Sequence, residues 1–178
     1  MPYYVYGQDR PDAGPAMEKL TEAHWSYMDR FADRLILRGP TRSDDGAEHT
    51  GSVHVVDLPA QASAERFAAE EPFQQAGLFQ RIIVAPALIV RHREPGRDLA
   101  LVTGEWPPHD SPLGAELDDQ VSFAAVLGAD PSRSTGLVAV LSAPQLDQAA
   151  TVIQALADQL AGQPVNLTAQ RWKPGGRR

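Results

Sequence analysis

The sequence predicts an α+β fold made of two tandem ferredoxin-like units, each ordered strand, helix, strand, strand, helix, strand. Three observations predict it. Segments typical of strands and helices follow one another in this order through the first half of the chain. Leu35-Ile36-Leu37 is apolar on both sides of a strand, so the sheet needs cover on the face without helices, which a second unit would supply. A short pattern also recurs in register: Thr50-Gly51, Val53, Val55 and Pro59 return as Thr135-Gly136, Val138, Val140 and Pro144. We therefore expect two units packed as an intrachain pseudo-dimer.

The first half supplies one complete unit. A helix is predicted from Met17, because apolar residues at Leu20, Tyr27 or Met28, Phe31 and Leu35 form one stripe. Gly7 and Gly39-Pro40 should end strands, Ser63 is a possible N-cap, and Pro72 disfavours helical geometry at Glu71. The other elements expected are strands at 3–6, 35–37, 53–56 and 82–90, the last bent or interrupted at Pro86, and a helix at 62–70. Polar loops are expected after Gly7, holding Pro11, Gly14 and Pro15, and at 41–49.

The second half repeats the unit in degenerate form. Its first strand is expected at 99–103, and its first helix should be short or lost because the segment 106–119 contains Pro107, Pro108, Pro112 and Gly114. Leu146, Ala149, Ile153, Leu156 and Leu160 predict an amphipathic helix, followed by a break at 162–164 and a closing strand at 165–172. We expect two domains, residues 1–93 and 98–178.

The composition of the chain argues against several classes of protein function. The chain has no cysteine, which excludes thiolate chemistry and disulfides and fits a cytoplasmic location, as does an N-terminus without a signal-peptide pattern. A net charge of −7 argues against a nucleic-acid partner, and every apolar run is too short to cross a membrane. The basic cluster Arg171, Lys173, Arg177 and Arg178 is interpreted as a solvated tail. Neither a nucleotide-binding glycine motif nor a recognised metal-ligand spacing occurs, so we expect no cofactor and no metal.

His24 is the strongest candidate for chemistry. It is the one polar member of the apolar helix stripe, where an ionisable group is normally excluded unless it is paired or functional. An imidazole can pass a proton in either direction near neutral pH. Glu71, at the end of the second helix, is the expected carboxylate partner, with Glu70 as the alternative. A histidine at a helix edge can instead simply hydrogen-bond a backbone carbonyl, so a structural role stays open.

The first half resembles the YCII-related family. The resemblance rests on Tyr3-Tyr4-Val5-Tyr6, Gln8-Asp9, His24, Gly39-Pro40, Thr50-Gly51-Ser52, Glu71-Pro72-Phe73, Ala76-Gly77-Leu78, Ile83-Val84 and Pro86. It implies a dimeric ferredoxin-like α/β barrel whose pocket uses a His and Asp pair. His24 matches the family histidine, whereas the usual Asp-Pro is here Glu71-Pro72, one methylene longer. Leu113 and Leu156 stand at the corresponding positions of the second half, which would therefore have lost the pair and kept a packing role.

Four further residues are predicted to bind substrate. Arg38, at a strand end, could hold an anionic group. His54 alternates with Val53 and Val55 and is placed either in the pocket or, slightly preferred, at the sheet rim. Tyr6 and Phe73 belong to the resembling motifs. His49 and Asp44-Asp45 lie in a loop interpreted as a lid or a turn.

We therefore predict a cofactor-independent enzyme in which His24 and Glu71 transfer a proton on a small cyclic or carbonyl compound. Elimination, dehydration and isomerisation all fit. The alternative is a non-catalytic small-molecule binding or accessory protein with the same pocket. The expected partner is a small molecule, with no nucleic acid and no membrane, and the chain is expected to be a monomeric pseudo-dimer or a homodimer.

Overall fold

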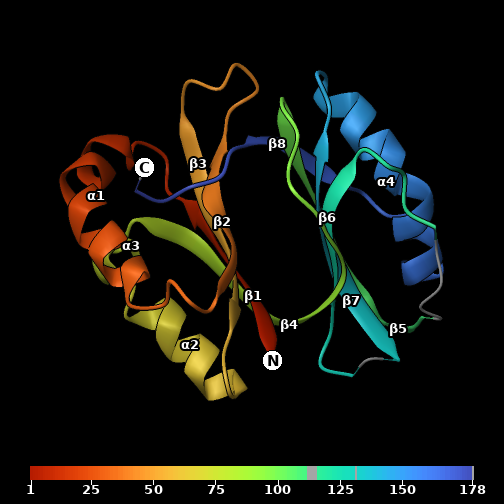
Figure 1. Cartoon of the computed structure of the whole chain (residues 1–178), viewed down its shortest axis with the longest axis horizontal. Helices are drawn as coiled ribbons and strands as arrows, with labels where there is room; N and C mark the ends of the chain where they lie inside the picture. Colours follow the sequence, from red (N-terminus) through yellow and green to blue (C-terminus); the bar gives the residue numbers. More distant parts are fainter. Residues whose placement is uncertain (112–115, 131, 178) are drawn as a thin grey trace. The chain divides into compact units, whose positions relative to one another are not determined.

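The chain divides into two compact units in the computed structural model, which describes residues 1–111, 116–130 and 132–177 (Figure 1). The first unit is Met1–Pro86 together with Lys173–Arg178, and the second is Ala87–Trp172. Both are antiparallel α+β units. In the described residues, no helix is long and apolar enough to cross a membrane.

The first unit has the predicted ferredoxin-like topology. Its elements are β1 (Pro2–Asp9), α1 (Gly14–Asp29), β2 (Leu35–Arg42), β3 (His49–Asp57), α2 (Gln61–Ala69), the short α3 (Pro72–Gln75) and the first part of β4 (Phe79–His92). The sheet runs β4-β1-β3-β2, every neighbour antiparallel. The helices cover one face of this sheet (Figure 1). The core between helices and sheet includes Tyr3, Tyr27, Val56 and Phe67.

Two of the predicted strand ends, at Gly7 and at Gly39-Pro40, are wrong. β1 continues through Gly7, whose missing side chain makes room for the Phe79 ring, since a Cβ there would lie 2.6 Å from it. β2 likewise continues through Gly39-Pro40 to Arg42. Pro40, which has no N–H, lies opposite Ser52 in the ladder with β3. Neither glycine ends its strand, and Gly7 allows close packing against Phe79.

The helix starts also differ from expectation. α1 begins at Gly14, with Pro15 in its first turn, where the absent N–H has no helical partner in any case. Ala60 rather than Ser63 precedes α2, and it provides no side-chain cap. Glu71 is extended, as Pro72 predicts, with φ −64° and ψ 130°. It is the N-cap of α3, an element that periodicity did not reveal because it is only four residues long.

The second unit repeats the strand order, and its described residues contain no counterpart of α1. It contains the second part of β4, then β5 (Leu99–Asp110), β6 (Val121–Leu127), β7 (Arg133–Ser142), α4 (Leu146–Ala161) and β8 (Thr168–Trp172), in the sheet order β8-β5-β7-β6-β4. No helix occurs in the described residues between β5 and β6. Pro112, Leu113 and Gly114 lie outside the described residues. β4 itself is continuous through Pro86 and changes partner from β1 to β6 at that point.

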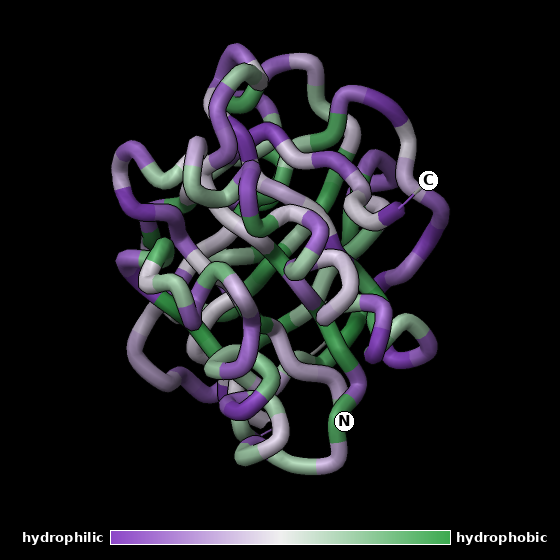
Figure 2. Tube along the Cα trace, turned by 90° about the vertical axis from the view of Figure 1, so that its left-hand side faces the viewer, coloured by the Kyte–Doolittle hydropathy of each residue, from purple (hydrophilic) through white to green (hydrophobic). Residues whose placement is uncertain are grey.

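The strand register confirms the duplication. Tyr6 pairs with Val53 and Gln8 with Gly51 in the first unit. In the second unit Thr103 pairs with Val138 and Glu105 with Gly136. The recurring Val and Gly positions therefore occupy the same places in two sheets of the same order. Hydrophobic residues gather along these strands, whereas many of the connecting loops are hydrophilic (Figure 2).

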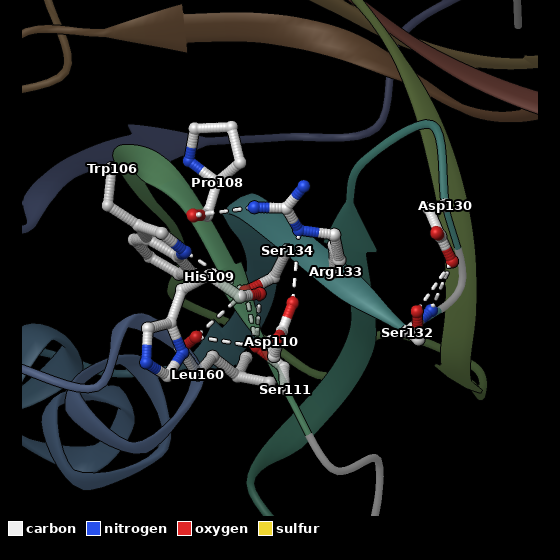
Figure 3. Close-up of polar contacts among 10 residues, drawn as sticks. All are labelled: Trp106, Pro108, His109, Asp110, Ser111, Asp130, Ser132, Arg133, Ser134 and Leu160. Carbon is white, nitrogen blue, oxygen red and sulfur yellow. Dashed lines mark hydrogen bonds and ion pairs between the residues drawn. The ribbon is translucent and has the colours of Figure 1, made fainter.

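In the second unit, two buried serines hydrogen-bond the last turn of α4 (Figure 3). The hydroxyl oxygens of Ser111 and Ser134 lie 2.6 and 2.8 Å from the carbonyl oxygen of Leu160, and 2.6 Å from each other. The Trp106 indole N–H donates to Ser134 at 3.0 Å. Because last-turn carbonyls lack partners within a helix, this cluster is a structural cap. Leu156 packs against the adjoining hydrophobic core.

The C-terminal segment is bound to the first unit. The interpretation of the basic cluster as a solvated tail is therefore wrong for Arg177. The Gly175 N–H donates to the Arg38 carbonyl oxygen at 2.9 Å. The Arg177 guanidinium donates to carboxylate oxygens of Glu22 at 2.6 Å and Asp29 at 2.9 Å, both on the outer surface of α1. Arg171 bonds the carbonyl oxygens of Ala143 and Pro144. Arg178 lies outside the described residues.

Candidate active site

His24 and Glu71 form a close, largely buried pair. His24 comes from the second half of α1, and Glu71 is the N-cap of α3. The His24 Nδ1 and Glu71 Oε1 atoms are 2.6 Å apart, and the two side chains are only 13% and 5% exposed. The other oxygen, Oε2, accepts the backbone N–H of Gln74 at 3.0 Å. The carboxylate is therefore held at both oxygens, once by a helix cap and once by the imidazole.

This geometry selects one form of the imidazole. An ionised carboxylate only accepts hydrogen bonds, so Nδ1 must carry the proton that it shares with Glu71. In the neutral ring the lone pair then lies on Nε2, the nitrogen on the far side from Glu71. The arrangement gives a base with a fixed tautomer and a carboxylate that would stabilise the imidazolium form.

Phe73 holds the imidazole in place. Its ring stacks on His24 with centroids 4.5 Å apart and planes within 4° of parallel. Phe73 is buried and makes an edge contact with Phe79, which packs under Gly7. Phe73 follows Glu71 by two residues, so α3 delivers both the carboxylate and the stacking ring. Of the four predicted substrate-binding residues, Phe73 makes the closest ring contact with His24.

His54 is buried beside His24 and does not lie at the sheet rim. It belongs to β3, an inner strand of the unit's sheet, and it is 5% exposed. Its ring centroid lies 5.9 Å from that of His24 and 5.7 Å from that of Phe67. Burial first, and then the charges of the nearby His24 and Arg38, together lower the pKa of His54 to about 3. His54 is therefore neutral in the folded chain near pH 7.

Arg38 and Tyr6 lie on different faces of the sheet. Arg38 pairs with His54 in the β2-β3 ladder, and its Nη1 is 3.8 Å from the Asp29 carboxylate on α1. Tyr6 pairs with Val53, one residue from His54, and stacks on Tyr4 two residues away. Since side chains alternate across a strand, Tyr6 points to the face opposite His54 and is not part of the His24 cluster.

A second histidine–carboxylate pair escaped the sequence prediction. His49 Nδ1 lies 2.6 Å from Asp9 Oδ2. The sequence pattern placed His49 in a loop, whereas it is the first residue of β3. The pairing of β1 with β3 would have predicted this contact. Gln8 pairs with Gly51, so the adjoining ends of the two strands bring Asp9 and His49 together. In the part of the chain described, no group of three or more potential metal ligands is found.

We expect the buried His54 to make stability depend on pH. An unfolded histidine titrates near pH ~6.5, whereas the folded pKa is about 3. Between these values the unfolded chain binds a proton that the folded chain does not. The free energy of unfolding should therefore fall by up to about 1.4 kcal/mol per pH unit as pH drops below ~6.5. Above that pH, His54 is neutral in both states and its effect on stability no longer changes with pH.

Urea denaturation of the wild type and His54→Leu at several pH values between 4 and 7 checks this expectation. The variant should lose stability less steeply as the pH falls. The exposed His92 supplies the control, because His92→Gln should keep the wild-type slope. Equal slopes for wild type and His54→Leu would contradict the expectation.

Sequence comparisons with known proteins match the first unit of the chain. Residues 1–87 match the YCII-related domain. The chain is 27% identical over 93 residues to Protein YciI of Escherichia coli O6:H1, covering 48% of this chain and 95% of that protein. An uncharacterized Haemophilus influenzae protein matches with the same identity and coverage.

Solved structures give weaker likenesses. The 5-chloro-2-hydroxyhydroquinone dehydrochlorinase TftG from Burkholderia phenoliruptrix AC1100, in complex with 2,5-dihydroxybenzoquinone, is 25% identical and covers 55% of this chain and 97% of that one, with a TM-score of 0.44. A putative monooxygenase from Fusobacterium nucleatum is 10% identical, covers 97% of this chain and 91% of its own, and has a TM-score of 0.48. Because these scores are low, the family resemblance rests on sequence: residues 1–87, just under half of the chain, match the YCII-related domain.

Proposed function

We propose that this chain is a cofactor-independent enzyme in which His24, oriented by Glu71, transfers a proton on a small cyclic or carbonyl compound. The observation that carries the proposal is the 2.6 Å contact between His24 Nδ1 and Glu71 Oε1 at a site where both side chains are largely buried. Partial burial strengthens the electrostatic interaction between the two groups. Glu71 is itself fixed by α3, so the imidazole is oriented before any ligand binds.

The proposed step uses the nitrogen that Glu71 leaves available. His24 Nε2 takes a proton from a carbon or oxygen of the substrate, and the resulting imidazolium is stabilised by the Glu71 carboxylate. The released electron pair forms a double bond as a leaving group departs, or moves onto a carbonyl oxygen. Elimination, dehydration and isomerisation share this first step. None of them transfers an electron or a hydride, so proton-transferring side chains are sufficient.

A non-catalytic binding protein is the second candidate. The observation in its favour is the glutamate at position 71, because the family motif resembled by this sequence has an aspartate there. The longer side chain still reaches His24, but the position of the imidazole relative to a ligand would change. Such a shift could preserve binding while lowering the rate of the chemical step.

A ligand screen followed by a turnover assay separates the two candidates. Small phenols, hydroxyquinones and lactones are added to the purified chain, and the melting temperature is measured. A compound present at 100 times its Kd should stabilise the folded state by about 2.7 kcal/mol. Stabilising compounds are then incubated with the protein and followed by proton NMR. Conversion supports the enzyme, binding without conversion supports the binding protein, and an absence of stabilisation across all three classes contradicts both.

A further inference from the structure

The pair formed by His49 and Asp9 resembles the His24–Glu71 pair in geometry. In each pair an imidazole Nδ1 lies 2.6 Å from a carboxylate oxygen. In each the carboxylate is the more buried partner: the Asp9 side chain is 6% exposed, and that of His49 is 25% exposed. By the same reasoning as for His24, the ionised Asp9 fixes the proton on His49 Nδ1 and leaves Nε2 available.

Asp9 has an unused hydrogen-bond acceptor. Its Oδ2 atom contacts His49, whereas Oδ1 is buried without a hydrogen-bond partner among the described residues. A buried carboxylate oxygen without a partner costs free energy, and the cost is larger for a charged group than for a neutral one. Because an ionised carboxylate cannot donate, the missing partner must be a donor. A hydroxyl group of a bound ligand would supply it.

Phe73 connects the two pairs. One face of its ring is stacked on His24, with centroids 4.5 Å apart. His49 meets the same ring at an interplanar angle of 79°, with centroids 6.5 Å apart. The two imidazoles therefore border a single phenyl ring from two directions. A small ring compound that contacts Phe73 can be approached by both histidines.

We propose that His49, positioned by Asp9, is a second proton-transfer group that acts on the same ligand as His24, and that Asp9 Oδ1 binds a hydroxyl of that ligand. This inference rests on the proposed function and assigns it a substrate class, small hydroxylated rings. His24 Nε2 removes a proton from the substrate, and the imidazolium form of His49 gives a proton to the carbonyl oxygen or leaving group that receives the electron pair. His24 ends protonated and His49 neutral. Exchange with water, to which His49 is the more exposed, restores both.

The first experiment uses the wild-type chain labelled with 15N-histidine, with resorcinol as the probe. Ring-nitrogen shifts are followed as resorcinol is added. We expect the signals of His24 and His49 to move together and to give one Kd, while those of the exposed His92 stay constant. Movement of His24 alone would overturn the inference and leave the proposed function standing. Movement of neither imidazole would also overturn the inference, whereas the proposed function would still be judged by its own ligand screen.

The second experiment tests Asp9 directly with a matched pair of ligands. Asp9→Asn should raise the Kd for resorcinol about tenfold, because a hydrogen bond to a charged acceptor is lost. The Kd for 1,3-dimethoxybenzene, which has no hydroxyl donor, should change less than twofold. Glu18→Gln, at an exposed position of α1, serves as the control variant. Equal effects of Asp9→Asn on the two ligands, or none on either, would overturn the role of Oδ1, and circular dichroism verifies that the variant is folded.

Discussion

Replacing His24 by glutamine should lower the rate of proton transfer by about 100- to 10,000-fold, the range that general acid–base groups contribute. Glutamine is a good helix former and can still hydrogen-bond Glu71, but it has no nitrogen that accepts a proton near neutral pH. Because glutamine keeps an N–H donor for the Glu71 carboxylate, no buried charge is left without a partner. The chain should therefore stay folded while its chemistry is lost.

The measurement is turnover of a compound that the ligand screen shows to be converted, at saturating concentration. Glu18→Gln is again the matched control, since it makes the same kind of change on the exposed side of the same helix. The control should retain the wild-type rate. A His24→Gln variant with more than half the wild-type rate would exclude His24 as the proton-transfer group. Loss of affinity without loss of rate would instead favour a binding role.

Replacing Phe73 by alanine should lower the free energy of unfolding by about 3–5 kcal/mol, the usual cost of removing a buried phenyl ring. Phe73 is 4% exposed and contacts Phe79, His24 and His49. The cavity would also free both imidazoles from the ring that orients them. Urea denaturation followed by circular dichroism measures the loss of stability. A loss below about 1 kcal/mol would show that the ring is not packed as described.

Phe67 provides a comparison that separates stability from orientation. It is 2% exposed, and its ring contacts are with Tyr27, Phe31 and His54 rather than with His24 or His49. The milder variants Phe67→Leu and Phe73→Leu should both be folded and similarly destabilised. Only Phe73→Leu should shift the ring-nitrogen signals of both His24 and His49. Equal shifts in the two variants would mean that general loosening, rather than loss of the shared ring, moves the imidazoles.

The sequence predicted what depends on periodic patterns. The helix stripe that contains His24 and the recurring Thr-Gly register were visible because each repeats at a fixed interval. Pro72 placed Glu71 outside a helix, and the structure shows Glu71 in contact with His24. The role of this contact in catalysis stays a prediction.

The features that were missed depend on neighbours distant in the sequence. Gly7 looked like a strand end because its packing partner, Phe79, is far along the chain. The face occupied by Tyr6 is fixed by the β1-β3 register, and the burial of His54 depends on Phe67 in α2. The pair of His49 and Asp9 needed the same register. Local patterns identify elements, whereas pairing decides which side chains meet.

The attachment of Arg177 to α1 affects the order in which the two units can finish folding during synthesis. Arg177 contacts Glu22 and Asp29 although 155 and 148 positions separate them along the chain. During synthesis, the helix that carries His24 emerges long before the residue that anchors its outer surface. The first unit is thus completed only after the second unit has been synthesised. A protein fused close behind Arg177 would therefore lie next to α1, the helix that carries the proposed proton-transfer residue His24.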